Sequence, residues 1–316
     1  MRLAGRQEGI IMGHMFKKVF EGDEDGVSGA ITAMMIIMII SSFISLIYAV
    51  YIPTWTKDAE ADHSKLVLSQ FLDIKEKIDD QIINSGQNQG ISVTSRVTLG
   101  RSGGPVFGMG TTSGLLSVNP YQDTITMFNS NSIDETFAQA RGNISYRSQT
   151  QYFQKQVYVY QYGAVIVAQV KSTAGGRTTY DAVLKVQPHF KAEKDLLGNV
   201  TISMVQVALL GDQKQLSGTQ DLNVRTTLNS VDTNDLTRDV YPTLRNLTMN
   251  VTTDFTSVWM EYYQNALAKN VTGMTEKIGA GAGDYNITTT GRIVTVKFWN
   301  VNAINIDNAI IAVDIE

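Results

Sequence analysis

The stretch DEDGVSGAITAMMIIMIISSFISLIYAVYIP, residues 23–53, determines how the rest of the chain is organised. Within it, Val27 to Ile52 form a run of 26 residues without a formal charge. A helix rises about 1.5 Å per residue, so about 20 apolar residues cross the hydrocarbon core of a bilayer. The sequence therefore predicts a transmembrane helix at residues 27–52, with membrane lipid as its partner.

A cleaved secretory signal is the alternative interpretation of such a segment. Signals of that kind have an apolar run of about 7–15 residues that ends at a small-x-small site. The run here is longer, and its end carries Tyr48, Tyr51, Pro53 and Trp55 in place of such a site. We therefore expect a retained span whose aromatic residues lie at the outer membrane interface.

The distribution of basic residues predicts the orientation of this span. Those that precede it are Arg2, Arg6, Lys17 and Lys18, whereas only Lys57 and Lys65 follow it closely. Because basic residues are retained on the cytoplasmic side, residues 1–26 are predicted to be a cytoplasmic leader. The chain is then a single-pass protein of the cell membrane with an extracellular C-terminal ectodomain. Whether translation starts at Met1 or Met15 stays open.

Small residues recur along one face of the predicted span. This helix-packing face consists of Gly29, Ala33, Ser41, Ser45 and Ala49. Small side chains let two helices approach closely in lipid, so the face predicts association with a second helix. Small residues are also common in isolated transmembrane helices, and that alternative stays open.

Residues 53–89 are predicted to form an amphipathic stalk helix, kinked at Pro53. Apolar residues with helical spacing mark its buried face: Val67, Phe71, Ile74, Ile78 and Ile82. The turn-forming sequence NSGQNQG, residues 84–90, ends the helix.

From residue 90 onward, the pattern changes to alternating and β-branched residues. The predicted strands are ISVTSRVTL (91–99), YQDTITMF (121–128), VYVYQYGAVIVAQV (157–170), TTYDAVLKV (178–186), NVTISMVQVALL (199–210), QDLNVRTTL (220–228), RIVTVKFWN (292–300) and AINIDNAIIAVDIE (303–316). One helix is expected after Asp254 as its cap, with Trp259, Tyr263 and Leu267 on one face. The fold class is therefore mainly β, with residues 90–316 forming an antiparallel β-sandwich or jelly-roll-like ectodomain.

Composition argues against several classes of function. The net charge of −4 and the scattered basic residues exclude a nucleic-acid footprint. With no cysteine, disulfides and thiolate metal sites are absent, and His14, His63 and His189 lie too far apart in the sequence to indicate a shared metal site. We expect no cofactor and no enzymatic activity, although a pair of carboxylates brought together by folding stays an alternative.

Three further patterns have a structural and a functional interpretation. The glycine clusters at 100–114 and 279–286 lack the GK[ST] of a phosphate loop, so turns are expected. Tyr158, Tyr160 and Tyr162 alternate and would share one strand face, either packed under a neighbouring layer or exposed to bind carbohydrate or a partner. Candidate N-glycosylation sequons begin at Asn143, Asn199, Asn246, Asn250, Asn270 and Asn286.

The sequence DGVSGAITAMMIIMII, residues 25–40, resembles the start of archaeal type IV pilins and pilin-like surface proteins. The resemblance implies prepilin-peptidase cleavage between Gly26 and Val27, and assembly with itself or other pilin-like subunits through the apolar helix. More distantly, VTLGRSGGPVFG (97–108), YVYQYGAVIVAQ (158–169) and VTTDFTSVWMEYY (251–263) resemble archaeal single-span envelope proteins with a β-rich ectodomain.

These patterns and resemblances predict a pilin-like archaeal cell-surface protein with a structural or interaction role. A non-polymerising anchored ectodomain for adhesion or envelope organisation is the alternative, and a surface enzyme is the third.

Overall fold

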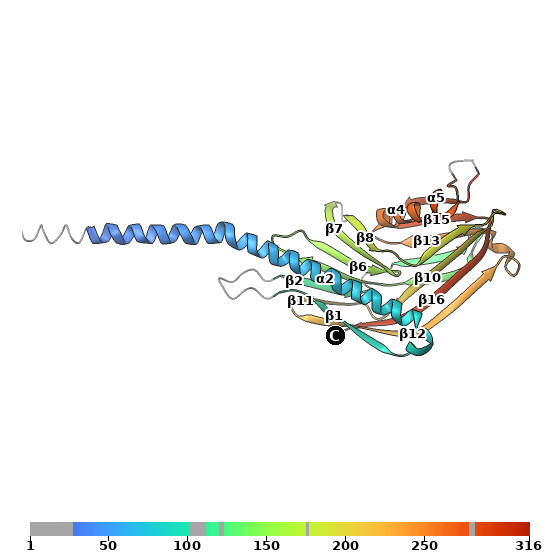
Figure 1. Ribbon diagram of the computed structural model, residues 1–316, viewed down its shortest axis with the longest axis horizontal. Coiled ribbons are helices and arrows are strands. Elements are labelled where there is room, and N and C mark those ends of the chain that lie inside the picture. The colour runs from blue at the N-terminus through green and yellow to red at the C-terminus, as the bar shows by residue number, and fades with distance from the viewer. Residues whose placement is uncertain (1–27, 102–111, 120–122, 175–176, 278–281) are drawn as a thin grey trace, which may run out of the picture. The chain divides into compact units, whose positions relative to one another are not determined.

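The computed structural model describes residues 28–101, 112–119, 123–174, 177–277 and 282–316 (Figure 1). The chain divides into two compact units, Met1–Lys57 and Asp58–Glu316. The predicted leader, residues 1–26, and the Gly26–Val27 bond lie outside these ranges, because the described part begins at Ser28.

The described part of the first unit is helical. Residues 28–46 are α-helical, η1 (Ile47–Tyr51) is a π-helical turn, and α2 (Ile52–Ile83) follows without a break. In the π turn, the N–H of Ile52 donates to the carbonyl of Ile47, five residues back. Pro53 has no N–H and its ring crowds the carbonyl of Ala49, so a wider turn just before it avoids that clash.

Apolar side chains of the first unit are exposed. The exposed large apolar side chains between Ile31 and Val50 each leave 48% to 69% of their surface accessible. Several hydroxyls in this unit donate to the carbonyl four residues back, including Ser41 to Ile37 and Ser42 to Met38. The outer surface of the helix is therefore apolar, and these hydroxyls make their hydrogen bonds within the helix. The helix is long and apolar enough to cross a membrane.

The second unit contains the rest of α2, whose predicted apolar face is confirmed. Val67, Phe71, Ile74 and Ile78 are each at most 1% exposed, and Ile82 packs partly buried beside them. The stalk was predicted to extend to residue 89, but α2 ends at Ile83 and the short helix α3 (Ser85–Asn88) follows it. Gly90, with a φ of +79°, then turns the chain into the first strand.

The strands of the second unit form three sheets. The first sheet has the order β1 (Ser92–Thr98), β12 (Asp221–Thr237), β16 (Val301–Ile315), β10 (Val200–Leu210) and β9 (Phe190–Lys194). The second is β11 (Lys214–Gly218), β2 (Ser113–Val118), β5 (Asn143–Gln149), β6 (Gln156–Gln161), β7 (Ala164–Ala174) and β8 (Arg177–Val186). The third is β14 (Tyr285–Thr290), β15 (Ile293–Trp299), β13 (Asn246–Thr252), β3 (Thr124–Asn129) and β4 (Ser132–Arg141).

The prediction of a mainly β unit is confirmed, but the prediction that its strands are antiparallel is wrong at one pair. β10 and β16 run parallel, with Val200 opposite Val301 and Leu210 opposite Ala312. A parallel pair needs a long crossover between its strands. Here the intervening chain contributes strands to all three sheets as well as α4 (Thr256–Ala266), so the crossover is a large part of the fold.

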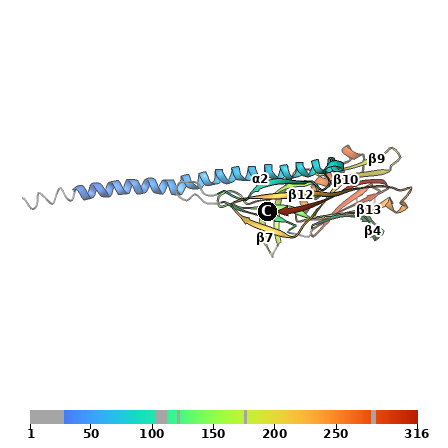
Figure 2. The same cartoon turned by 90° about the horizontal axis from the view of Figure 1, so that it is seen from below.

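Two hydrophobic cores fill the space between these layers. One core contains the apolar face of α2 together with residues of the first and second sheets. Figure 2 shows α2 lying along the sheet that contains β12 and β10. The other core joins the third sheet, the opposite face of the second sheet and α4.

The long strands of the first sheet serve both cores. In β10, Val200 and Ile202 belong to the core around α4, whereas Val207 and Leu209 belong to the core around α2. These pairs differ in parity along the strand, so they point to opposite faces. The first half of β10 therefore packs against the core around α4 on one face, and the second half packs against the core around α2 on the other face.

The tyrosine pattern is confirmed in part. Tyr158 and Tyr160 are buried in the core around α2, as the packing interpretation predicts. Tyr162, however, forms the tight β6–β7 turn with Gly163, at φ values of +51° and +79°. Such a turn reverses the chain, and the Tyr162 ring packs in the other core, 5.9 Å from the Trp259 ring.

Polar contacts connect α2 with the second sheet. Both carboxylate oxygens of Glu60 accept backbone hydrogen bonds, from the N–H groups of Gln151 (2.7 Å), Tyr152 (2.9 Å) and Phe153 (2.6 Å). Glu60 is only 1% exposed. Its negative charge is thus held by three converging amides, which sets the position of α2 along the sheet.

One turn further along α2, His63 and Ser64 contact the hydroxyls of two buried tyrosines. His63 Nε2 lies 3.1 Å from the hydroxyl of Tyr146, and Ser64 Oγ lies 2.6 Å from that of Tyr158. Burial lowers the pKa of His63, which favours the neutral form of its ring.

The helix predicted after residue 254 forms, but with a different start. Trp259, Tyr263 and Leu267 are each at most 1% exposed, which confirms its apolar face. The N-cap of α4 is Phe255 and has no side-chain cap, so the prediction that Asp254 caps this helix is wrong. The Asp254 carboxylate instead accepts a hydrogen bond from Arg292.

Candidate functional site

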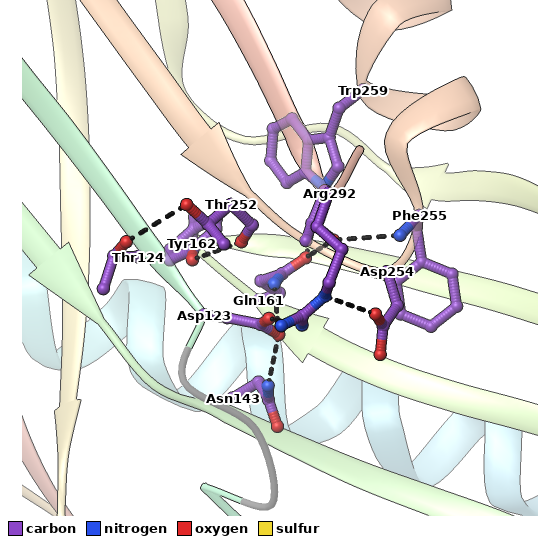
Figure 3. A network of polar contacts seen from close by, with 11 residues as sticks. Asp123, Thr124, Asn143, Gln161, Tyr162, Thr252, Asp254, Phe255, Trp259 and Arg292 are labelled. Atoms are coloured by element: carbon purple, nitrogen blue, oxygen red, sulfur yellow. Dashed lines mark hydrogen bonds and ion pairs between the residues drawn. The ribbon is translucent and has the colours of Figure 1, made fainter. Parts of the chain in front are cut away.

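A buried polar network joins the second and third sheets, centred on Asp123 (Figure 3). Asp123 immediately precedes β3, Asn143 begins β5, and Gln161 ends β6. Arg292 lies in the turn between β14 and β15. Each residue thus stands where a strand begins or ends, which brings side chains from two sheets to one place.

Three donors surround the Asp123 carboxylate. Asn143 Nδ2 and Gln161 Nε2 donate to Oδ2 at 2.6 and 2.7 Å, and Arg292 Nη2 donates to Oδ1 at 2.8 Å. Asp123 is 2% exposed. The ion pair with Arg292 supplies the positive charge that a buried carboxylate needs.

Arg292 connects this carboxylate with a second one. Its Nε donates to Asp254 Oδ1 at 2.6 Å, while its Nη2 holds Asp123. Its backbone carbonyl accepts the N–H of Thr253 at 2.8 Å. One arginine therefore ties the β14–β15 turn to the residues that follow β13 and to the residue that precedes β3.

Gln161 extends the network into the core around α4. Its Oε1 accepts hydrogen bonds from Thr253 Oγ1 (3.0 Å) and Trp259 Nε1 (3.2 Å), while its Nε2 donates to Asp123. Thr253 Oγ1 in turn accepts the N–H of Phe255 at 3.1 Å, at the start of α4. The indole of Trp259, the largest of the fully buried side chains among the described residues, is thus linked to the Asp123 carboxylate through the amide of Gln161.

Burial dominates the ionisation of Asp123. Removal of the carboxyl from water raises its pKa to about 6, against the opposing effects of Arg292 and Asn143. All three donors favour the ionised form, so at neutral pH the group is a bound carboxylate. A general acid would need a proton directed at a substrate, whereas here both carboxylate oxygens accept hydrogen bonds from protein donors.

A cavity of about 170 Å³ adjoins the network, on the face of the second sheet opposite α2. Polar groups on this face include Ser117, Ser145 and Gln215, and Phe255 closes one side. Asn143 also lines it, and its Oδ1 has no hydrogen-bond partner among the described residues. The cavity has room for water molecules or a small polar molecule beside the network.

The six candidate glycosylation sites differ in their surroundings. Asn143 is 1% exposed and its Nδ2 donates to Asp123, so a glycan on this atom is incompatible with the network. Asn199 and Asn286 donate through Nδ2 to Asp195 and to the carbonyl of Lys277. Asn246 and Asn250 are half-buried on β13, and Asn270, in α5 (Lys269–Thr272), is exposed. Exposure therefore favours Asn270 as a site of modification.

The predicted helix-packing face lies on the exposed helix of the first unit. Gly29, Ala33, Ser41, Ser45 and Ala49 are all exposed. A Cβ added at Gly29 would meet nothing within 4 Å. The face is thus available for a contact outside the chain.

Neither glycine cluster adds a phosphate site within the described residues. Residues 102–111 of the first cluster lie outside them, and its flanks, Arg101 and Thr112, pair as an isolated antiparallel bridge. Part of the second cluster, residues 279–281, is also outside the described ranges. Over the described ranges, no three His, Cys, Asp or Glu side chains gather as a metal site would require.

The comparisons with known proteins add no relative: no family model, no curated protein and no solved structure matches the chain. Sequence reasoning missed the network around Asp123. The residues that form it are separated by up to 169 positions, and the only local signal is a charged residue immediately before a strand, as at Asp123 and Arg292.

Proposed function

We propose that the protein is a membrane-anchored, pilin-like archaeal cell-surface protein with a structural or interaction role. The apolar helix of residues 27–52 lies in lipid or in a shared helical core, and the β-rich unit is displayed outside the cell. The leader of residues 1–26 is cytoplasmic before it is removed between Gly26 and Val27.

The observation that carries this proposal is the exposed apolar helix. The most apolar 18-residue window of the helix Ser28–Ile83 has none of its residues buried. An apolar surface of this extent is unfavourable in water, at roughly 25 cal/mol per Å², and needs lipid or other helices around it. The predicted helix-packing face, with Gly29 and Ala33, then supports close contact with a second helix.

The buried part of α2 supports a mechanical role for the helix. Its apolar side chains lie in the core of the β-rich unit, and Glu60 binds three backbone amides of the loop that joins β5 to β6 in the second sheet. A helix held in this way resists extraction from the unit when it is pulled. That property suits a subunit whose helix is fixed in a filament or in a membrane.

The alternative is an anchored ectodomain that does not polymerise and acts in adhesion or envelope organisation. The size of the β-rich unit, Asp58–Glu316, favours this version, because so large a unit is bulky for a filament subunit. In this version the leader stays attached and the helix remains a membrane anchor.

The third candidate, a surface enzyme, rests on Asp123 beside the 170 Å³ cavity. The three protein donors on its carboxylate argue for a structural role instead. A surface binding role is therefore better supported than catalysis.

N-terminal sequencing of the mature protein from membranes and from sheared surface filaments tests the proposal. Val27 as the first residue, in a filament fraction, supports the pilin-like version. An intact leader in the membrane fraction alone rejects it in favour of the non-polymerising anchor. Recovery of the chain in the soluble fraction of lysed cells rejects both.

A further inference from the structure

The strand β8 forms one edge of the second sheet and pairs with β7 on one side only. Among the described residues, no loop or cap backbone hydrogen bond involves residues 177–186. At the centre of the strand, Val183 is 56% exposed. An edge strand of this kind presents N–H and C=O groups to which another strand can add.

Two opposite charges flank Val183 on the same face of β8. Asp181 and Lys185 line the groove beside α2 together with Val183, and both are exposed. Neither side chain makes an ion pair or a hydrogen bond with any described residue. Both charges are therefore available to a partner.

Basic side chains on three other edge strands, β1, β9 and β11, already have partners within the chain. The pairs are Arg96 with Asp221, Lys191 with Glu193, Lys194 with Asp284, and Lys214 with Asp314. The edge of β8 differs from these three because its acidic and basic groups are both left without an ion-pair partner among the described residues.

The order of residues in β8 is self-complementary. When two copies pair antiparallel about Val183, that residue lies opposite itself, Ala182 lies opposite Leu184, and Asp181 lies opposite Lys185. Opposed residues share a face with their Cβ atoms about 4.5–5.5 Å apart, so the opposite charges attract each other. Parallel copies in register would bring like charges together. We propose that β8 of one copy pairs antiparallel with β8 of a second copy in this register.

A bulge limits the length of this contact. β8 is in regular register with β7 from Tyr180 to Leu184, and Lys185 is the extra residue that follows. Backbone pairing with a second copy therefore centres on residues 182–184, and the long side chain of Lys185 reaches Asp181 beyond that segment. So short a contact is weak alone, but many copies on one surface strengthen it through multivalency.

The direction of β8 determines how two paired copies are oriented. β6 runs in the same direction as α2, because Ser64 contacts Gln156 and, further along both elements, the Phe71 ring lies 6.1 Å from the Tyr158 ring. β7 is antiparallel to β6, and β8 is antiparallel to β7, so β8 also runs in the direction of α2. Antiparallel pairing of two β8 strands therefore points the two α2 helices in opposite directions.

The N-terminal ends of the two α2 helices, which continue into the apolar helices, then lie at opposite ends of the pair. The consequence rests on the proposed function, in which the apolar helix anchors each copy in a membrane. Copies in one membrane share one direction and cannot pair in this way, whereas copies in two facing membranes can. The partner is thus a second copy of this chain on another surface, joined through a two-fold contact.

Cysteine cross-linking tests the pairing in purified protein, because the chain has no cysteine of its own. Full-length Val183→Cys protein is oxidised in detergent, where no membrane restricts how the copies are oriented. We expect a disulfide-linked dimer, since the pairing places position 183 opposite itself. The matched control, Val271→Cys, is 68% exposed on α5. It should give on the order of 10-fold less dimer, because a disulfide needs two closely placed Cβ atoms.

Charge reversal in the Val183→Cys chain tests the register. Asp181→Lys leaves two positive charges on the edge and Lys185→Asp leaves two negative charges, so each variant should repel its own copies. Either variant alone should lower the linked dimer on the order of 10-fold, and a mixture of the two should restore it. Both side chains are exposed, so neither change disturbs the core.

Vesicle clustering tests the orientation of the copies. Full-length protein without the cysteine, reconstituted into phosphatidylcholine vesicles, should cluster them. Vesicles with Lys185→Asp should cluster only when vesicles with Asp181→Lys are added. Flotation of the protein with the vesicles tests the membrane anchor separately from the pairing.

Two results in detergent overturn the pairing of β8: linkage at position 183 no greater than at position 271, or no recovery of linkage when the two charge variants are mixed. Linkage in detergent with no clustering of vesicles that carry the protein overturns the arrangement across two membranes. Failure of the protein to float with vesicles rejects the anchor of the proposed function, and the linkage in detergent still decides the pairing.

Discussion

At the scale of single residues, Asp123 makes the fold sensitive to pH. Its carboxyl has a pKa of about 6 in the folded chain and 3.8 as the reference for the unfolded chain. The folded state therefore keeps a proton that the unfolded state loses over this interval. The contribution of Asp123 to the free energy of unfolding is fully present below pH 3.8 and falls as the pH rises to about 6.

The Asp123→Asn variant isolates this effect. One pKa unit corresponds to about 1.4 kcal/mol, so the difference in unfolding free energy, wild type minus variant, should fall by about 3 kcal/mol in total as the pH rises from about 3 to about 7. Denaturant titrations followed by tryptophan fluorescence measure it, since Trp259 lies in the same network. A difference that stays constant or increases over this interval would contradict the assignment.

Glu60 is the second residue whose charge has a defined structural role. Glu60→Gln places an amide among three backbone N–H donors, so at least one loses its acceptor. We expect a loss of about 1–3 kcal/mol in unfolding free energy. The control, Glu76→Gln on an exposed position of α2, should change it by less than about 0.5 kcal/mol. Equal losses in the two variants would refute the role of Glu60.

At the scale of elements, the buried part of α2 shows what local sequence can predict. The helical spacing of Val67, Phe71, Ile74 and Ile78 identifies the buried face correctly, because that spacing is a property of the helix itself. The end of the helix is less well predicted, since NSGQNQG supports both a turn and the short α3.

Phe71→Ala tests the contribution of this face. The side chain is 0% exposed and lies 6.1 Å, ring to ring, from Tyr158. Its removal should lower the unfolding free energy by about 3–5 kcal/mol through lost burial and a residual cavity. Leu72→Ala, at a neighbouring position that is 37% exposed, serves as the control and should cost far less. Urea unfolding of both variants distinguishes them, and similar losses would contradict the packing described for α2.

Strands were predictable where an alternating pattern was long enough. β1, β10 and β15 have clear alternation, and the sequence identifies them. The strands that it misses are β2, β4, β5, β9, β11, β13 and β14. Several of these are short or mostly polar, such as β9 and β11 with five residues each, and their pairing partners stabilise them more than their own sequence does.

At the scale of the whole molecule, the features that the sequence could not predict are those that depend on contacts between residues far apart in the chain. The parallel pairing of β10 with β16 depends on the fold of the chain between them. The same is true of the Asp123 network, whose partners come from two sheets. By contrast, the apolar segment is evident from composition alone, because a span needs only length and apolar character.

The proposed function places the β-rich unit outside a membrane that the apolar helix crosses. A single cysteine at Val271, introduced into the cysteine-free chain, reports this when intact cells are treated with a membrane-impermeant maleimide. We predict labelling of Val271→Cys on intact cells at the level seen after lysis. Labelling that appears only after lysis would place the unit inside the cell and contradict the account.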